Sequence, residues 1–432
     1  MRVVADFHIH SKYSRATSRD LNMGTLSAGA KKKGINLLAT GDFTHPIWIS
    51  EISRDLQEDG SGFLIPKSSL DFARDKGVKF ILSSEISSIY SKNGKVRKIH
   101  NILLAPSIAD AKKINEVLSK VGNLHSDGRP ILGLDSEKLV EMVWDVSPES
   151  LVIPAHIWTP WFSLFGSNSG FDTLEECYGK YSDRIYAYET GLSSDPSMNW
   201  RVSQLDNLTL LSNSDAHSVK NLMREANVFE WKPSEYTFGN LAETLKNKNT
   251  EKLKYTIEFF PEEGKYHYDG HRNCNIVMNP QESIKNNNIC PVCHRPLTLG
   301  VDHRVEELST REIGEKPEKA SDVLYAIPLN EIIAHVYGVG PYTKKVIEEA
   351  DKLVGYFGSE FAVLIDAPID AILKVASSPL ISASIDKMRK GEVTKEPGYD
   401  GVFGKIYVPI DSIQAPELEQ SGIIKEKQGK LF

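Results

Sequence analysis

The sequence predicts an α/β fold, and three observations support this class. Short apolar runs typical of buried strands alternate with stretches of helical periodicity through the first half of the chain. Ligand-type polar residues stand at or near the ends of these apolar runs. The alternation stops after about residue 235. We therefore predict a distorted seven-stranded (β/α)7 barrel followed by two smaller domains.

Seven apolar runs are the expected strands of the barrel: residues 3–7, 35–40, 78–83, 99–104, 151–155, 185–188 and 208–212. Helical periodicity between several of them predicts helices at residues 68–76, 108–121, 136–144 and 172–179. Seven strands joined by crossovers favour a barrel over an open sheet.

Length and composition limit the remaining possibilities. A chain of 432 residues exceeds one ordinary domain, and we place domains at 1–240, 241–315 and 316–432. No apolar run approaches the roughly 18 residues of a membrane span, and the N-terminus shows no secretory signal. We expect a cytoplasmic protein with no membrane partner. The net charge of −7 leaves only local basic patches for binding nucleic acid.

The first predicted strand ends in Asp6-Phe7-His8-Ile9-His10. Alternate side chains of an extended strand share a face, so Asp6, His8 and His10 are expected to point the same way. This arrangement is typical of a metal clamp, although two histidines in a half-buried strand are the alternative.

Similar residues occur beside the other predicted strands. Their positions are Asp42, Glu85, His100, His156, Glu189, Asp215 and His217. Side chains at the carboxyl ends of barrel strands converge on one mouth, where barrel enzymes keep their chemistry. Each residue alone could satisfy backbone donors, but the set favours a site for Zn, Mn or Mg. Two such ions can promote phosphoester hydrolysis.

These residues match a known pattern. Asp6-Phe7-His8-Ile9-His10, Glu85, His100, Pro154-Ala155-His156 and Ser214-Asp215-Ala216-His217 resemble the motifs of the polymerase-and-histidinol-phosphatase (PHP) domain over about residues 1–235. The resemblance implies a distorted PHP-type barrel. It also implies that His8, His10, Glu85 and Asp215 hold one metal ion, that Glu85 bridges to a second at His100 and His156, and that His217 serves a third.

One segment departs from the family pattern. The family has Thr-Asp-His after the second strand, whereas this chain has Asp42-Phe43-Thr44-His45. Arg15 stands near the place of another usual ligand. Two ions are therefore the expectation, and a third is optional.

The loop after His156 is rich in aromatic residues, among them Trp158 and Trp161. Such rings can stack on a nucleobase held out of a helix. Packing of a large loop is the alternative.

A small zinc-binding domain is expected next. His271-x-x-Cys274 and Cys290-x-x-Cys293 have the spacing of a closed Cys3His site for one structural Zn. Reduced surface thiols are the alternative, and His267, His294 or His303 could complete the site instead. Cys177 stands alone as an expected buried apolar residue.

The last domain is expected to be α-helical. Helical stretches at 329–336 and 341–353 flank Gly338-Val339-Gly340. The arrangement resembles a helix-hairpin-helix, which binds DNA phosphates through backbone N–H groups, here with Lys344 and Lys345 nearby. A plain turn capped by glycine is the alternative. Residues 427–432 faintly resemble a peptide that docks on sliding clamps.

The whole order of motifs resembles the endonuclease Q family nearly end to end. That resemblance implies nicking of damaged DNA on the 5′ side of hypoxanthine, uracil, xanthine or an abasic site, with Asp215, Glu85, His8 and His10 as catalytic residues. Three other hypotheses stay open: another PHP nuclease acting on DNA, a histidinol-phosphate-type phosphatase, and a DNA-binding protein with a decayed barrel.

Overall fold

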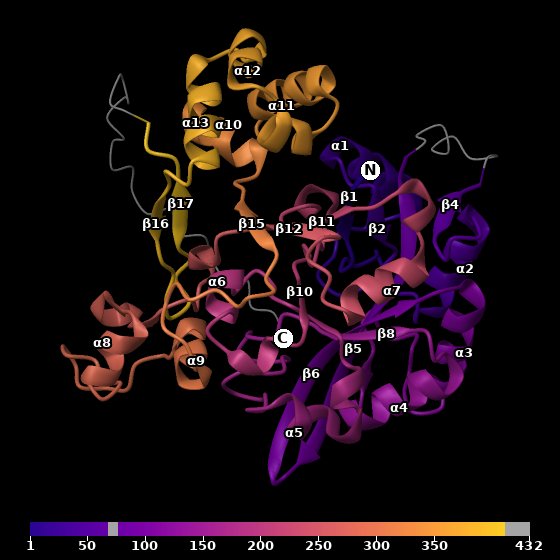
Figure 1. Ribbon diagram of the computed structural model, residues 1–432. Coiled ribbons are helices and arrows are strands. Elements are labelled where there is room, and N and C mark those ends of the chain that lie inside the picture. The colour runs from indigo at the N-terminus through magenta and orange to yellow at the C-terminus, as the bar shows by residue number, and fades with distance from the viewer. Residues whose placement is uncertain (68–76, 411–432) are drawn as a thin grey trace.

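The computed structural model describes residues 1–67 and 77–410. The predicted helix at 68–76 and the clamp-like peptide at 427–432 lie outside these residues. The described residues form an α/β fold: a mixed β-sheet with helices around it and two smaller regions beside it (Figure 1). The α/β class predicted from the sequence is confirmed.

The described part of the first 258 residues contains twelve strands, which include all seven predicted ones. Their bounds are β1 (Arg2–Asp6), β2 (Leu37–Ala39), β3 (Leu56–Glu58), β4 (Leu64–Pro66), β5 (Lys79–Lys92), β6 (Lys95–Ala105), β7 (Ile131–Leu132), β8 (Leu151–Pro154), β9 (Ala187–Glu189), β10 (Thr209–Leu211), β11 (Ala226–Glu230) and β12 (Leu253–Glu258).

The sheet is open and does not close into the expected barrel. Its hydrogen-bonded order is β15-β12-β11-β1-β2-β5-β4-β3, with β6, β7 and β8 branching from β5. The strands β9 and β10 pair with each other as a separate parallel ladder. Among the described residues no ladder joins β8 to β9 or β10 to β11, which leaves the ring of strands interrupted at two places.

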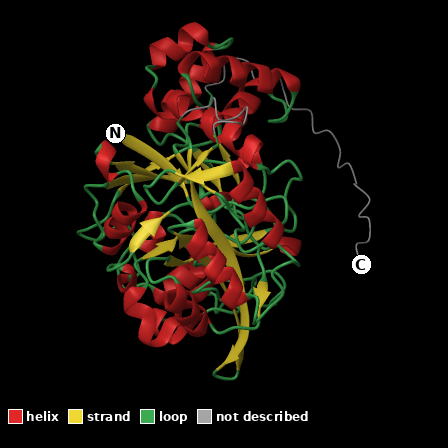
Figure 2. Cartoon of the chain, turned by 90° about the vertical axis from the view of Figure 1, so that its right-hand side faces the viewer, coloured by secondary structure: helices red, strands yellow, loops and turns green. Residues whose placement is uncertain are grey.

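The longest pairing of the sheet is the antiparallel hairpin of β5 and β6. Its strands pair from Leu82 with Ala105 to Lys92 with Lys95. Asn93 and Gly94 form the two-residue turn, both at positive φ, which is the backbone that a tight hairpin turn requires. The long yellow strands projecting at the lower end of Figure 2 are this hairpin.

The helices of the first half cover the sheet, and most begin at a side-chain cap. Asn22, Ser107 and Asp135 cap α1, α3 and α4 by accepting backbone N–H bonds. The bounds are α1 (Met23–Lys33), α2 (Pro46–Asp55), α3 (Ile108–Leu118), α4 (Ser136–Val146), α5 (Leu174–Tyr178), α6 (Pro196–Asn199) and α7 (Phe238–Lys246).

The second half returns to the large sheet before it forms the helical region. The strand β15 (Asp322–Tyr325) pairs in parallel with β12, although the sequence predicted no strand after residue 235. The segment between β12 and β15 carries β13 (Asp269–His271), β14 (Ile276–Met278), α8 (Pro280–Lys285) and α9 (Val301–Leu308). The division at residues 240 and 315 stays a prediction.

The C-terminal region is mainly helical, as predicted. Its elements are α10 (Leu329–Tyr337), α11 (Lys344–Phe357), α12 (Ile369–Val375), α13 (Pro379–Arg389), β16 (Thr394–Glu396) and β17 (Lys405–Tyr407). The helices gather at the top of Figure 1, and the β16–β17 hairpin extends below them. Ion pairs tie it to the first half of the chain: Arg2 with Asp366, and Lys33 with Glu360 at 2.8 Å.

No helix among residues 1–67 and 77–410 is both long enough and apolar enough to cross a membrane.

Candidate metal centre

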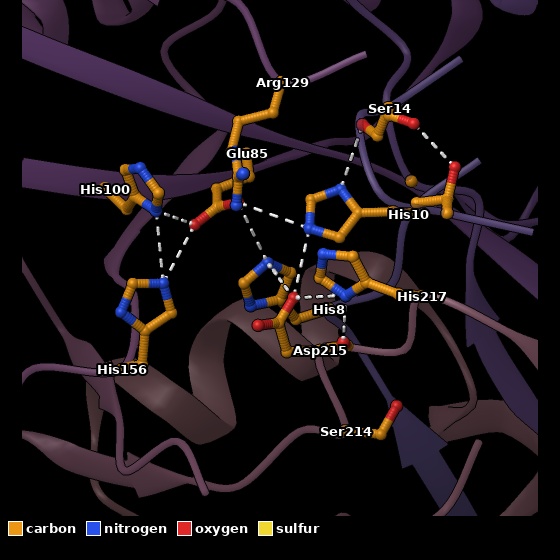
Figure 3. Close-up of polar contacts among 12 residues, drawn as sticks. His8, His10, Ser14, Glu85, His100, Arg129, His156, Ser214, Asp215 and His217 are labelled. Atoms are coloured by element: carbon orange, nitrogen blue, oxygen red, sulfur yellow. Dashed lines mark hydrogen bonds and ion pairs between the residues drawn. The ribbon is translucent and has the colours of Figure 1, made fainter. Parts of the chain in front are cut away.

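Histidines and carboxylates form a cluster around Glu85 (Figure 3). The two carboxylate oxygens of Glu85 face different pairs of histidines. Oε2 lies 3.5 Å from His8 Nε2 and 3.4 Å from His10 Nε2. Oε1 lies 2.5 Å from His100 Nδ1 and 3.0 Å from His156 Nε2. The carboxylate therefore stands between two nitrogen pairs, as a bridging ligand would.

The β5–β6 hairpin explains why Glu85 and His100 meet. His100 lies directly opposite Ser87, and Glu85 shares a face with Ser87 because side chains alternate along a strand. Glu85 and His100 are therefore diagonal neighbours, which long side chains can bridge. The two residues lie within long strands, although the sequence placed Glu85 after a strand and His100 at the start of one.

Asp215 and His217 complete a second part of the cluster. Asp215 Oδ1 lies 3.1 Å from His10 Nε2 and 3.6 Å from His8 Nε2. The ring of His217 tilts against that of His10 with centroids 4.6 Å apart. Asp6, expected on the same face as His8 and His10, instead accepts bonds from Ser214 behind the cluster.

Around Glu85, the described residues form three groups whose donor atoms lie within 4.8 Å of one another: His8 with His10 and Glu85, His10 with Asp215 and His217, and Glu85 with His100 and His156.

Two further carboxylates lie behind the histidines. Glu189 Oε1 is 3.0 Å from His8 Nδ1, and Asp42 Oδ1 is 3.1 Å from His10 Nδ1. Such carboxylates orient metal-binding histidines and hold one tautomer. Asp42 stands outside the three donor groups, and its other oxygen accepts from Ser11 and Ser14.

The charges of the cluster suit cation binding. Burial would raise the pKa of Glu85, but His100, His8 and Arg129 lower it well below its usual value, so the carboxylate is ionised. Burial lowers the pKa of His100 to about 4, so its imidazole is neutral. Burial would also lower the pKa of His8, His10 and His156, but the neighbouring carboxylates raise it above the usual value. Metals bind ionised carboxylates and neutral imidazoles, so metal binding at these three rings would release protons.

One unpaired nitrogen provides a direct test of that fit. His8 Nε2 is buried and has no hydrogen-bond partner among the described residues. Buried polar atoms are normally paired, and a divalent cation held with His10 and Glu85 would satisfy this nitrogen. The donor set therefore fits the metal ions that the sequence implies.

The backbone is strained at three of these positions. Asp42, His156 and Asp215 have φ of 50°, 30° and 45°, a region that side chains disfavour. Such strain persists where the surrounding structure holds it and is common at functional sites. Gly191 permits one of these conformations, because a Cβ there would lie 2.3 Å from His156 Cβ.

Two residues beside the cluster were not predicted from the sequence. The guanidinium of Arg129 donates through Nη1 to Glu85 Oε2 at 3.1 Å. Ser14 Oγ lies 3.3 Å from His10 Nδ1, close to the position where Arg15 was expected to replace a ligand. The Asp127-Gly128-Arg129-Pro130 turn was the available signal for Arg129.

A cavity of about 470 Å³ opens next to the cluster. Thr159, which contacts His156 at 3.1 Å, lines it from the first half of the chain. His267 lines it from the region after β12, and its Nδ1 is buried without a partner in the part of the chain that the structure describes. Tyr342 lines it from the C-terminal helical region. All three regions of the chain therefore meet at this cavity.

The two tryptophans of the loop after His156 differ in exposure. Trp158 is buried, and its N–H donates to Asn199. Trp161 is 51% exposed, with Lys98 Nζ 4.8 Å above its ring. Of the pair, Trp161 is the one that presents a ring face to solvent.

The cysteine-rich region brings its four predicted ligands together. His271, Cys274, Cys290 and Cys293 have donor atoms within 4.8 Å of one another. Burial would raise the pKa of Cys290, but the backbone N–H groups of Cys293 and Val292 lower it to about 6, which favours the thiolate. His303 instead pairs with Asp269 at 2.6 Å.

The glycine turn between α10 and α11 is exposed. Gly338 ends α10 at φ +63°, as the glycine-cap interpretation requires. Gly340 lies beside it, also exposed. Lys344 and Lys345 are exposed in the first turn of α11, and Lys345 Nζ lies 4.0 Å over the ring of Tyr337. The turn is exposed as well as capped, and its Gly338 and Val339 N–H groups donate to α10.

Known proteins similar to this chain include two curated relatives. The uncharacterized protein YqxK of Bacillus subtilis is 31% identical over 424 residues, which cover 94% of this chain and 99% of YqxK. The uncharacterized protein MJ0043 of Methanocaldococcus jannaschii is 36% identical over 253 residues. That match covers 57% of this chain but only 31% of MJ0043, so the chain spans about a third of that relative. Residues 328–392 match the MJ0043 C-terminal domain family.

Two solved structures are similar over nearly the whole chain. One is the lesion-specific endonuclease PfuEndoQ from Pyrococcus furiosus, with a TM-score of 0.83, 32% identity and coverage of 96% of this chain and 98% of that one. The other is endonuclease Q with a 27-mer duplex bearing an abasic lesion at the active site. Its TM-score is 0.81 at 32% identity, with coverage of 98% and 100%.

Proposed function

Because the chain belongs to the endonuclease Q family, we propose that it is a DNA repair endonuclease that hydrolyses the phosphodiester 5′ of damaged nucleotides. The damage comprises abasic sites and the deaminated bases hypoxanthine, uracil and xanthine. The observation that carries this proposal is the full-length likeness to a lesion-specific endonuclease, combined with a complete cluster around Glu85. A small-molecule phosphatase would leave the second half of the chain without a role.

The proposed cofactors are two or three divalent ions, Zn, Mn or Mg, held by His8, His10, Glu85, His100, His156, Asp215 and His217. Such ions, when bound, activate water and stabilise the charge of an in-line phosphoryl displacement. The chain supplies their orientation: Glu85 presents one oxygen to each histidine pair, and Asp42 and Glu189 hold the rings of His10 and His8.

The cavity beside the cluster is the proposed pocket for the damaged nucleotide. An enzyme that acts at a base must first take it out of the stack. The cavity lies one contact from His156, through Thr159, and its volume of about 470 Å³ suits a nucleotide better than a water cluster. His267, which lines this cavity, would contact the nucleotide held there.

The other regions would grip the flanking duplex. A structural Zn at His271, Cys274, Cys290 and Cys293 would hold that region folded. The N–H groups of Gly338 and Val339 already donate to carbonyls of α10. The N-terminus of α11, with Lys344 and Lys345, would therefore bind phosphates, and the exposed Trp161 would stack. Docking of residues 427–432 on a sliding clamp, and a cytoplasmic location, stay predictions.

A nicking assay tests the proposed function. Metal-stripped and metal-restored protein is incubated with labelled duplexes that carry one abasic site, uracil or hypoxanthine, beside an undamaged duplex and a phosphomonoester. We expect a metal-dependent nick 5′ of the lesion and intact undamaged strands. Monoester hydrolysis with every duplex intact would favour the phosphatase, and cutting of undamaged DNA would favour another PHP nuclease.

A further inference from the structure

Among the described residues, Arg129 is the one arginine or lysine in contact with the central carboxylate of the cluster, Glu85. Its Nη1 donates to Glu85 Oε2 at 3.1 Å, the same oxygen that faces His8 and His10. The side chain comes from an irregular turn, residues 127–130, that precedes β7. None of the three donor groups includes it.

Several contacts hold this turn in place. Gly128 N donates to Tyr13 O at 2.9 Å, and Arg129 N donates to Asp127 Oδ1 at 3.1 Å. Ser87 of β5 donates to Pro130 O at 3.0 Å. A Cβ at Gly128 would lie 2.3 Å from Asp42 Oδ2, so the backbone passes directly against the site. The position of Arg129 is therefore fixed by its backbone.

Arg129 lies on the open side of the cluster. The side chains of Glu85 and His10 are fully buried, whereas those of Asp215, His217 and Arg129 are 26%, 31% and 27% exposed. Figure 3 shows Arg129 and Asp215 on different sides of Glu85. A ligand that reaches the cluster from solvent meets this exposed face.

The charge of Arg129 indicates the kind of ligand. A guanidinium beside bound divalent cations is repelled, unless an anion compensates it. Glu85 supplies one such anion, but its negative charge also faces the histidine nitrogens and would be shared with the metal ions bound there. A guanidinium carries five N–H donors in a fork that matches phosphate oxygens, and the described residues use one of them.

We propose that Arg129 donates to a non-bridging oxygen of the scissile phosphodiester and stabilises the charge that develops there during hydrolysis. Water adds to phosphorus and loses a proton, the bond to the leaving oxygen breaks, and that oxygen takes up a proton. This inference rests on the proposed endonuclease function and deepens it. The competing role is purely structural, in which Arg129 only holds Glu85 in place.

Single-turnover nicking of an abasic duplex separates the two roles. Arg129→Ala is expected to lower the rate constant by about 10²- to 10³-fold, the usual loss for one oxyanion donor. Bound metal and duplex affinity should match the wild type. Free guanidinium should restore part of the rate to Arg129→Ala and none to Asp215→Ala. Arg129→Lys should fall between wild type and Arg129→Ala.

Arg184→Ala is the control for lost positive charge, because Arg184 stacks on Trp144 instead of facing the cluster. It should nick at the wild-type rate. A wild-type rate for Arg129→Ala, a fall that parallels lost metal, or no response to guanidinium would overturn the inference while wild-type nicking upholds the proposed function. If the wild-type protein leaves every duplex intact, both fail.

Discussion

Asp42 and Glu189 were predicted either as additional ligands or as groups that support the ligands, and each lies behind a histidine ring at hydrogen-bond distance. Carboxylates in that position raise the basicity of the ring and fix its tautomer. Asp42→Asn and Glu189→Gln should therefore each weaken metal binding by about 10- to 100-fold while leaving the fold intact. Competition with a coloured chelator measures the affinity.

Glu116→Gln is the matched control, because Glu116 is an exposed residue of α3 that pairs with Lys120. It should bind metal as the wild type does. Unchanged affinity in both Asp42→Asn and Glu189→Gln would show that the histidines need no such support.

A different buried carboxyl, Glu258, should make stability depend on pH. Burial raises its pKa from 4.5 to about 8, although the hydroxyls of Ser212 and Thr256 lower it. The folded protein keeps this proton while the unfolded chain loses it. The free energy of unfolding should therefore fall as pH rises from about 4.5 to about 8 and then level off.

Chemical denaturation across this range measures the effect. Glu258→Gln should remove part of the pH dependence, since its amide does not ionise. Glu230→Gln, at the exposed end of β11, should keep the wild-type slope. Equal slopes for wild type and Glu258→Gln would mean that this carboxyl is ionised in the fold.

At the scale of elements, the loop after β9 supports the cluster because its Gly191 leaves room for His156. Gly191 has φ +66°, and an added Cβ would lie 2.3 Å from His156 Cβ. Gly191→Ala should therefore displace His156, reduce bound metal and abolish nicking. Gly60→Ala separates this clash from backbone strain, because Gly60 has φ +82° with open space around it. It should lose about 1–2 kcal/mol of stability to the left-handed backbone and keep its metal.

Bound metal is counted by elemental analysis, and melting temperature reports stability. If Gly60→Ala loses metal as Gly191→Ala does, strain rather than the clash with His156 is the cause.

Strands were predictable where they were apolar on both faces. All seven runs of the first half form strands because they are buried on both sides. The strand β12, Leu253–Glu258, mixes lysine and threonine with apolar residues and was missed. Asn93-Gly94 is a hairpin signal between two strand-like runs, and it could have revealed that β5 and β6 are long and antiparallel.

The site was predictable in residue type and less so in geometry. Histidines and carboxylates at strand ends suggest ligands, but whether Asp42 is a ligand or a support depends on distances that spacing does not encode. The same holds for Trp158 and Trp161, which are three residues apart and opposite in exposure. Arg129 carries no periodic signal at all, because its turn lies between regular elements.

At the scale of the whole molecule, β12 and β15 connect the three regions. The chain leaves the large sheet at β12, forms the cysteine-rich region, and returns at β15, in parallel with β12, before entering the helices. Both accessory regions are thus attached to the sheet that carries His8 and Glu85. This path of the chain brings residues of all three regions around one cavity.

The net charge of −7 means that DNA must be held by local cations. Lys344 and Lys345 are exposed beside the open glycine turn. Replacing both with glutamine should weaken binding about equally for damaged and undamaged duplexes, because phosphate contacts carry no sequence or lesion information. The slope of log affinity against log salt should shrink by roughly 1 for each phosphate that a lysine no longer neutralises. The single-turnover rate at saturating protein should stay unchanged, since neither lysine lies at the cluster.

Lys112 and Lys113, exposed neighbours on α3, provide the control pair and should leave the slope at its wild-type value. A steeper loss for damaged DNA, or a slower rate at saturation, would place the glycine turn in lesion recognition instead of in duplex binding.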